Sequence, residues 1–192
     1  MLQLKMYRKP QNVLFKAAPD GVSVRTYNGT KEDMQLWIDM CKCGILGPDA
    51  GEKEYHECIT KDTRIDPLND IYMFELDGRV AATITAVIDR ETKIGTVHMV
   101  DSFEWARGRG IGSYMMFVVL NRLVSEGMEW IQLTTDDFRI AAIKSYIRQG
   151  FLPVNNDSDM EERWSKILAE IGMDEIEMLN LDFTEYKMVK RA

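Results

Sequence analysis

The most informative stretch of the chain reads Arg107-Gly108-Arg109-Gly110-Ile111-Gly112-Ser113, between a strand-like run, Val97 to Val100, and a helix-like run, Tyr114 to Val124. Three glycines in five positions remove the Cβ atoms that would block a close ligand, and they permit a positive φ where the backbone turns. The first amides of the following helix lack intrahelical partners and, with the helix dipole, attract an anion. Arg107 and Arg109 add positive charge. The stretch therefore predicts a phosphate or pyrophosphate site at a helix N-terminus.

Two common phosphate-binding loops do not fit this stretch. The Walker loop requires Gly-Lys-Ser/Thr, and no lysine lies here. The dinucleotide loop requires Gly-x-Gly-x-x-Gly, whereas the glycines fall at 108, 110 and 112. Taken alone, the loop also leaves open an ordinary strand-to-helix turn with solvated arginines.

The composition predicts one globular domain over residues 1–192, with enough apolar residues, 45%, to bury a core. A net charge of −7 argues against a general nucleic-acid or membrane-surface binder, so any anion site must be local. Three cysteines form an odd and sparse set without a signal peptide, which favours a reducing cytoplasm. We interpret Cys41-x-Cys43 as core thiols rather than a zinc site, and expect no metal.

Hydrophobic periodicity predicts alternating strands and helices. Val22 to Tyr27 alternates as a first strand, and Asp77-Gly78 suits a two-residue hairpin turn. Residues 44 to 70 indicate a long loop with one short helix. Further strands are predicted over residues 71–76, 79–88, 94–102, 130–135 and 151–154, and apolar helical faces include Met34, Trp37, Ile38 and Cys41, then Ile140, Ile143 and Ile147, then Trp164, Ile167, Leu168 and Ile171.

The helix after Asp136-Asp137, which we expect to act as its N-cap, carries Arg139, Ala142 and Tyr146 on nearly one stripe. Arg139 is expected in the first turn, with Tyr146 about 10 Å further along the axis. Taken alone, Tyr146 is better interpreted as a core aromatic whose hydroxyl is hydrogen-bonded. The final segment, where Leu179, Leu181 and Phe183 alternate, predicts a strand that closes the sheet or pairs with a second subunit.

Two motifs resemble those of the GCN5-related N-acetyltransferases (GNAT). Val100 to Ser113 is similar to the family's fourth strand and its loop Arg/Gln-x-x-Gly-x-Gly/Ala, in which Arg107, Gly110 and Gly112 fill the defined positions. The second motif runs Arg139-x-x-Ala-Ile-x-x-Tyr146-x-x-x-Gly150-Phe151, and it carries Arg139 where many members have Asn. The order of elements resembles the family over residues 22–154, with a C-terminal helix and strand over 159–192 beyond it.

The resemblance implies a fold and a set of cofactor contacts. The fold is mixed α/β (α+β), with a mostly antiparallel central sheet of about six or seven strands, flanked by helices and splayed between the fourth and fifth strands. Acetyl-CoA is the implied cosubstrate, without a metal. The implied contacts are Val100, Asp101 and Ser102 for the pantetheine arm, Arg107, Gly108, Arg109, Gly110, Ile111, Gly112 and Ser113 for the pyrophosphate, and Arg139 and Tyr146.

Acetyl transfer to an amine requires a stabilised oxyanion, a neutral nitrogen and a protonated thiolate. A backbone amide near Val100 to Ser102 suits the oxyanion, and Tyr146 suits the general acid. Glu104 is our weak choice for the base. The other bases considered are Glu75, Asp101, Asp136, His56 and an ordered water.

The sequence therefore predicts an acyltransferase that moves an acetyl group from acetyl-CoA to a primary amine of a small molecule, by direct attack in a ternary complex. The alternatives are a protein or peptide N-acetyltransferase and a non-catalytic acyl-CoA-binding sensor. A homodimer through the C-terminal strand is a further expectation, whereas nucleic-acid and membrane partners are not expected. Five acidic residues lie between 44 and 70: Glu52, Glu54, Glu57, Asp62 and Asp66. Either this loop attracts a cationic amine, or its charges are only solvated.

Overall fold

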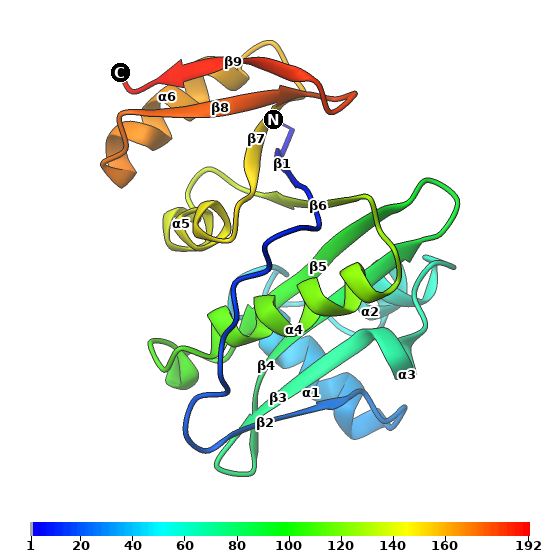
Figure 1. The fold of residues 1–192 in the computed structure, drawn as a ribbon. Helices are drawn as coiled ribbons and strands as arrows, with labels where there is room; N and C mark the ends of the chain where they lie inside the picture. Colours follow the sequence, from blue (N-terminus) through cyan, green and yellow to red (C-terminus); the bar gives the residue numbers. More distant parts are fainter. Residues whose placement is uncertain (1) are drawn as a thin grey trace. The chain divides into compact units, whose positions relative to one another are not determined.

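The computed structural model describes residues 2–192, and the chain divides into two compact units. The larger unit comprises Asn12–Met128, and the smaller unit combines the stretch up to Gln11 with Glu129–Ala192. Figure 1 shows the elements of each unit along the chain. Within residues 2–192, no helix has both the length and the apolar character needed to cross a bilayer. That the whole chain forms one domain stays a prediction.

The larger unit contains an antiparallel sheet in the order β2-β3-β4-β5. The turn between β3 and β4 consists of Asp77 and Gly78, both with positive φ, 51° and 79°, as the hairpin prediction required. These elements have the following bounds: β2 Val22–Thr26, α1 Lys31–Cys41, α2 Glu52–Tyr55, a π-helical turn His56–Thr60, α3 Pro67–Asp70, β3 Ile71–Leu76, β4 Arg79–Asp89, β5 Ile94–Ser102, a 3₁₀ turn Glu104–Ala106 and α4 Ile111–Ser125.

Helices α1 and α4 cover opposite faces of this sheet. Met73 of β3 packs in the core cluster that contains Trp37 of α1, whereas the next residue, Phe74, meets Tyr114 of α4 with ring centroids 5.7 Å apart. Successive strand residues point to opposite faces, so the two helices lie on different sides. The predicted apolar face of α1 is confirmed, since Trp37, Ile38 and Cys41 are buried.

The segment between α1 and β3 contains more helix than the sequence indicated. Three short helical pieces replace the expected loop with one helix. Glu54 accepts a hydrogen bond from the Gly51 amide at 2.7 Å, and Asp66 caps α3 ahead of Pro67. These local caps start helical turns that are too short for periodicity to reveal.

The smaller unit contains five strands in the order β6-β1-β7-β8-β9. β1 is antiparallel to β6 and β7, β7 is parallel to β8, and β8 is antiparallel to β9. The mixed, mostly antiparallel prediction is confirmed, with nine strands among residues 2–192 instead of six or seven; the splay between the family's fourth and fifth strands stays a prediction. The bounds are β1 Leu4–Arg8, β6 Trp130–Thr135, α5 Ile140–Arg148, β7 Leu152–Asn155, α6 Met160–Ile171, β8 Glu175–Asn180 and β9 Glu185–Lys190.

The first strand of the chain is β1, not Val22–Thr26. β1 pairs with β6 and β7, and it is buried on both faces of the sheet: Leu4, Met6, Tyr7 and Arg8 are all buried, so period-two alternation is absent. The Arg8 guanidinium donates to the carbonyls of Lys9, Gln11 and Gln149. These bonds satisfy a buried charge that sequence reasoning assigns to the surface.

The C-terminal strand was predicted with the wrong bounds. Leu181 and Phe183 lie in the turn between β8 and β9, where Phe183 has a φ of 69°. The Phe183 ring stacks on Trp130 at 4.6 Å and contacts Tyr7 at 4.7 Å. Aromatic packing, rather than strand pairing, accounts for this residue, and β8 extends the sheet through β7 within the same chain.

A buried ion pair anchors the start of α1 to the sheet. Asp33, whose side chain is 4% exposed, accepts bonds from Arg25 at 2.6 and 2.8 Å and from the Asn28 amide at 3.0 Å. Burial alone would raise the pKa of Asp33, but these hydrogen bonds outweigh it and the pKa is lowered. A lowered pKa contributes stability above pH 4 or so that is lost as pH falls through the folded-state value.

We expect Asp33→Asn to lower the free energy of unfolding by about 2 kcal/mol at pH 7, because Arg25 loses a buried charged partner. The variant should also show a smaller loss of stability than the wild type between pH 5 and pH 3. Urea denaturation across that range measures both effects. Asp39→Asn, on the same helix with a half-exposed carboxylate, is the matched control and should cost about 0.5 kcal/mol or less. Equal pH profiles for Asp33→Asn and wild type would contradict this assignment.

Candidate functional site

The glycine stretch forms the turn between β5 and α4. Gly108 and Gly110 have φ values of 76° and 78°, and Gly110 is the N-cap of α4. The first helical hydrogen bond runs from the Tyr114 amide to the Gly110 carbonyl, so the amides of residues 111 to 113 precede the helical ladder. The structure thus forms the helix N-terminus that the sequence predicted for an anion.

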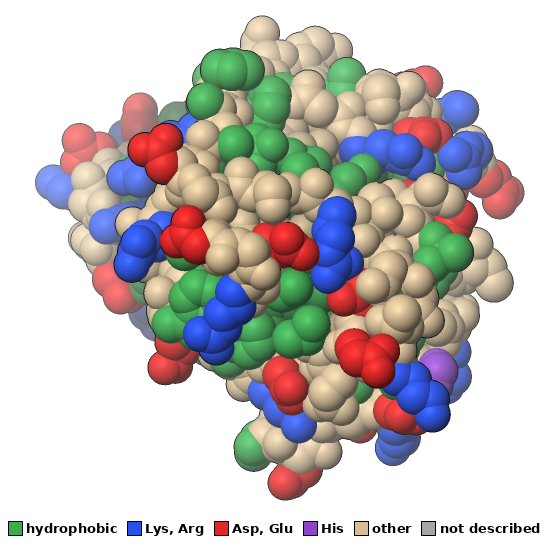
Figure 2. Space-filling model, turned by 90° about the horizontal axis from the view of Figure 1, so that it is seen from below, with side chains coloured by type: hydrophobic (Ala, Val, Ile, Leu, Met, Phe, Trp, Pro, Cys, Tyr) green, Lys and Arg blue, Asp and Glu red, His purple; other side chains and the backbone are tan. Residues whose placement is uncertain are grey.

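The space around this turn suits a bulky ligand. A Cβ atom at Gly108 or Gly112 would meet nothing within 4 Å, and one at Gly110 would lie 3.6 Å from Pro19. Figure 2 shows acidic and basic side chains interspersed over the face that it draws. An anion site at this turn therefore depends on local amides and arginines rather than on a broad positive surface.

The two arginines of the stretch are both exposed, Arg107 with 47% of its side chain. Arg107 directs Nη2 at two backbone carbonyls, those of Cys43 at 3.1 Å and Ser102 at 3.3 Å. Its guanidinium also lies 3.7 Å from Asp101 and 4.0 Å from Glu104. Sequence reasoning could not reveal the contact with Cys43, which lies 64 residues away.

A β-bulge interrupts β5 just before the turn. Thr83 pairs with Asp101 and Thr85 with His98, so two residues of β5, Met99 and Val100, oppose one of β4. Met99 has a φ of 48°, in the left-handed region. A bulge leaves one residue outside the ladder and re-aims the backbone. It falls where the sequence placed the oxyanion amide.

The carboxylates considered as bases have distinct environments. Asp101 is nearly buried, with 7% of its side chain exposed, and Oδ1 accepts the Ser102 amide at 2.8 Å. Glu104 is 81% exposed. Glu75 pairs with Arg25 at 2.8 Å, and His56 is exposed beside Thr60. Asp136, in the smaller unit, accepts from Gln3 and Arg139.

His98 is a candidate that sequence reasoning missed. It lies on β5 one residue before the bulge, and its Nε2 is 3.0 Å from the Cys58 carbonyl. A carbonyl only accepts, so Nε2 carries the proton and Nδ1 keeps its lone pair. Burial lowers the pKa of His98, although this hydrogen bond opposes the effect. The sequence did contain a signal for His98: it is one of only two histidines, and it lies two residues before Val100.

The second motif forms α5 of the smaller unit. Tyr146 is 8% exposed, and its ring contacts Phe151 at a centroid distance of 6.2 Å. Gly150 has a φ of 83° just beyond the end of the helix, as predicted. Arg139 is the N-cap rather than a first-turn residue, and its Nε donates to Asp136 at 2.9 Å.

The prediction that Asp136 and Asp137 cap α5 is wrong. Asp137 instead pairs with Arg163 of α6, which is 8% exposed. Hydrogen bonds from Arg163 lower the pKa of Asp137 against the opposing effect of burial. A long-range partner thus takes the carboxylate that local spacing assigned to a helix terminus.

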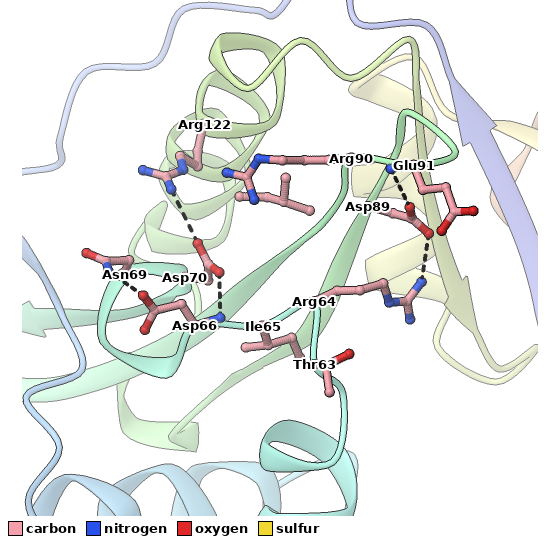
Figure 3. Close-up of a pocket in the computed structure, with 11 residues that line it drawn as sticks. Thr63, Arg64, Ile65, Asp66, Asn69, Asp70, Asp89, Arg90, Glu91 and Arg122 are labelled. Carbon is pink, nitrogen blue, oxygen red and sulfur yellow. Dashed lines mark hydrogen bonds and ion pairs between the residues drawn. The ribbon is translucent and has the colours of Figure 1, made fainter.

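The acidic residues between α1 and β3 have local partners. Glu54 accepts from the Gly51 amide, Glu57 pairs with Lys61, and Asp62 pairs with Arg64 at 2.7 Å. A cavity of about 680 Å³ lies between this segment, the β4–β5 turn and the C-terminal part of α4. Figure 3 shows two ion pairs in its lining, Arg122 with Asp70 and Arg64 with Asp89, each at 3.4 Å. Because Glu57 and Asp62 already have cationic partners, the pairing favours a solvated loop over one that attracts a cationic amine.

Cysteines and carboxylates do not gather into a metal site in the described chain. No group of three or more His, Cys, Asp or Glu residues suited to a metal ion occurs within residues 2–192. Cys41 is fully buried, and burial raises the pKa of its thiol. Cys43 and Cys58 are partly buried.

The sequence matches the model described as "Acetyltransferase (GNAT) family" over residues 34–151. The chain therefore belongs to the GNAT acetyltransferases, a family that uses acetyl-CoA. Mycothiol acetyltransferase from Tsukamurella paurometabola is 30% identical over 146 residues, which cover 70% of this chain and 50% of that protein. Mycothiol acetyltransferase from Streptomyces griseus is 25% identical over 153 residues, which cover 78% of this chain and 49% of that protein.

The chain spans about half the length of the curated relatives that it matches. A solved GCN5-related N-acetyltransferase from Sphaerobacter thermophilus is similar, with a TM-score of 0.64 and 18% identity over 78% of this chain and 47% of that chain. This likeness concerns the fold, and it agrees with the mixed α/β architecture.

We expect Gly110→Ala to weaken acetyl-CoA binding by about tenfold or more, because a side chain at positive φ displaces the amides at the start of α4. Isothermal titration calorimetry measures the affinity. Gly127→Ala is the matched control, since Gly127 has a similar φ of 74° beyond the other end of α4. Both variants should lose about 1 kcal/mol of stability, and only Gly110→Ala should lose affinity. Equal affinities would remove the turn from the binding site.

Proposed function

We propose that this protein is an acetyl-CoA-dependent N-acetyltransferase that acetylates a primary amine of a small molecule by direct attack in a ternary complex. The main support for the proposal is the glycine turn at the start of α4, which follows the bulged strand β5. In the proposal the turn binds the pyrophosphate of one elongated thioester ligand, and the bulge lies at its acetyl end. Family membership supports the reaction class. The curated relatives are named for mycothiol, a small molecule, and this favours a small acceptor over a protein.

In this proposal the larger unit supplies the main cofactor contacts. The amides of Gly108 to Ser113 hold the pyrophosphate at the helix N-terminus, and the exposed Arg109 adds a charged contact. Backbone groups of Val100 to Ser102 pair with the pantetheine arm. The fit rests on the open space beside Gly108 and Gly112. Arg107 and Arg139 stay proposed contributors to cofactor binding, each with a carboxylate also near its guanidinium.

Acetyl-CoA supplies an acetyl group activated as a thioester. In this proposal a backbone amide at the β5 bulge stabilises negative charge on a carbonyl oxygen, and the support is that a bulge leaves one residue outside the β4–β5 ladder. Tyr146 is the proposed general acid, since a phenol is protonated at neutral pH and can donate to a leaving sulfur.

Glu104 and His98 are both proposed to accept the amine proton, and they differ in their exposure to solvent. Glu104 is an exposed carboxylate, so it requires the bound acceptor to exclude water. His98 is partly buried, and its Nδ1 is able to accept a proton. Its lowered pKa keeps the imidazole neutral at pH 7, as a base must be.

We expect the purified protein to release free thiol from acetyl-CoA when a small primary amine is present. A panel of polyamines, aminoglycosides and peptide amines, followed with a thiol reagent, tests this directly. Acetylation of peptides alone would support the protein-acetyltransferase alternative. Binding of acetyl-CoA by calorimetry without thiol release for any acceptor would support the sensor alternative and contradict the enzyme proposal.

We expect Tyr146→Phe to lower kcat about 100-fold with little change in acetyl-CoA affinity, because the ring stays and only the proton donor is lost. Single-turnover kinetics and calorimetry separate the two quantities. Tyr186→Phe is the matched control, since the Tyr186 hydroxyl donates to Glu161 on the surface of the smaller unit. An unchanged chemical rate in Tyr146→Phe would exclude Tyr146 as the acid.

A further inference from the structure

Arg107 joins three separate segments of the larger unit. Its Nη2 donates to the carbonyl of Cys43, just beyond α1, and to the carbonyl of Ser102, the last residue of β5. Its own backbone begins the glycine turn, where the Arg107 amide donates to the Glu104 carbonyl. One nitrogen thus links the end of α1 to the end of β5.

The residue next to Cys43 reinforces this junction. A Cβ atom at Gly44 would lie 3.0 and 3.2 Å from the two carboxylate oxygens of Asp101, so the backbone approaches that side chain closely. Asp101 lies 3.7 Å from Arg107 and accepts the Ser102 amide. The backbone after Gly44 is held in turn by Cys41, whose carbonyl accepts the amides of Ile45 and Leu46, each at 2.8 Å.

We propose that Arg107 is a positioning residue that couples the glycine turn to residues 43–46, so that acetyl-CoA binding at the turn also orders the start of the segment between α1 and β3. The inference rests on the proposed function. Arg107 acts through its hydrogen bonds to two carbonyls, not through its charge on a phosphate. The exposed Arg109 is the charged contact of the pair.

The chemistry of the side chain gives this proposal a clear signature. A carbonyl needs an N–H donor and does not need a full positive charge. Gln at position 107 is shorter than Arg but keeps an N–H donor and loses the charge, whereas Met, which is similar to Gln in length, has neither the donor nor the charge. A phosphate contact would instead depend on charge and be weakened by salt.

Hydrogen exchange of the wild-type chain is the first test. Adding acetyl-CoA should slow exchange at the amides of residues 43–46 as well as at those of residues 108–113. Slowing confined to residues 108–113 would overturn the coupling and leave the proposed function intact. No slowing anywhere at saturating acetyl-CoA would overturn both.

Substitution at position 107 is the second test. Arg107→Met should weaken acetyl-CoA binding about tenfold and abolish the protection of residues 43–46, as expected for loss of hydrogen bonds from a charged donor. Arg107→Gln should stay within about threefold of wild type and keep the protection. Equal losses in both variants would overturn the proposal and show that the charge matters.

Arg109→Met is the matched control for charge. We expect it to weaken acetyl-CoA binding in a salt-dependent manner while protection of residues 43–46 persists at saturating ligand. Loss of that protection would show that the coupling does not depend on Arg107 in particular, and would overturn the proposal. Thermal denaturation of each variant verifies that the chain is folded.

Gly44→Ala crowds Asp101 and leaves residue 107 unchanged. It should also reduce the protection of residues 43–46 from hydrogen exchange.

Discussion

The left-handed backbone at Gly108 and Gly110 is the constraint on which the candidate site depends. β5 ends at Ser102 and α4 begins at Ile111, so the chain must reverse within a few residues. Glycine adopts φ values near 76° and 78° without the steric cost that other residues incur. The direction of α4, and therefore of its first amides, follows from that turn. The backbone geometry of the turn therefore determines which ligands these amides can bind, and the side chains add further contacts.

Charge in this chain is mostly used locally. Arg25 holds Asp33, Arg163 holds Asp137, and Arg64 holds Asp62, each within one unit. Such pairs orient helices and loops, and because each pair is neutral as a unit, it attracts a distant ligand only weakly. Arg107 follows the same rule, because its donors are directed at backbone carbonyls. An anion site is therefore compatible with an acidic protein.

Elements with strong local signals were predicted to the residue. The strands Ile71–Leu76, Ile94–Ser102 and Trp130–Thr135 have the expected bounds, because alternation or an apolar run between turn residues defines them. β1 was missed since a strand that is buried on both faces shows no alternation. Phe183 was misplaced because its contacts with Trp130 and Tyr7 lie far away in sequence.

The sequence by itself determined the glycine turn, the helix that follows it and the spacing of the motif around Tyr146, because these depend on φ preferences and helical periodicity within a few residues. Only the tertiary structure decided the bulge at Met99, the contacts of Arg107 and the partner of Asp137. Each of these joins groups on different elements, and no local pattern encodes which distant carbonyl or guanidinium a side chain meets. A binding or catalytic motif within a short segment can therefore be predicted from the sequence. The contacts that position its residues depend on the tertiary structure.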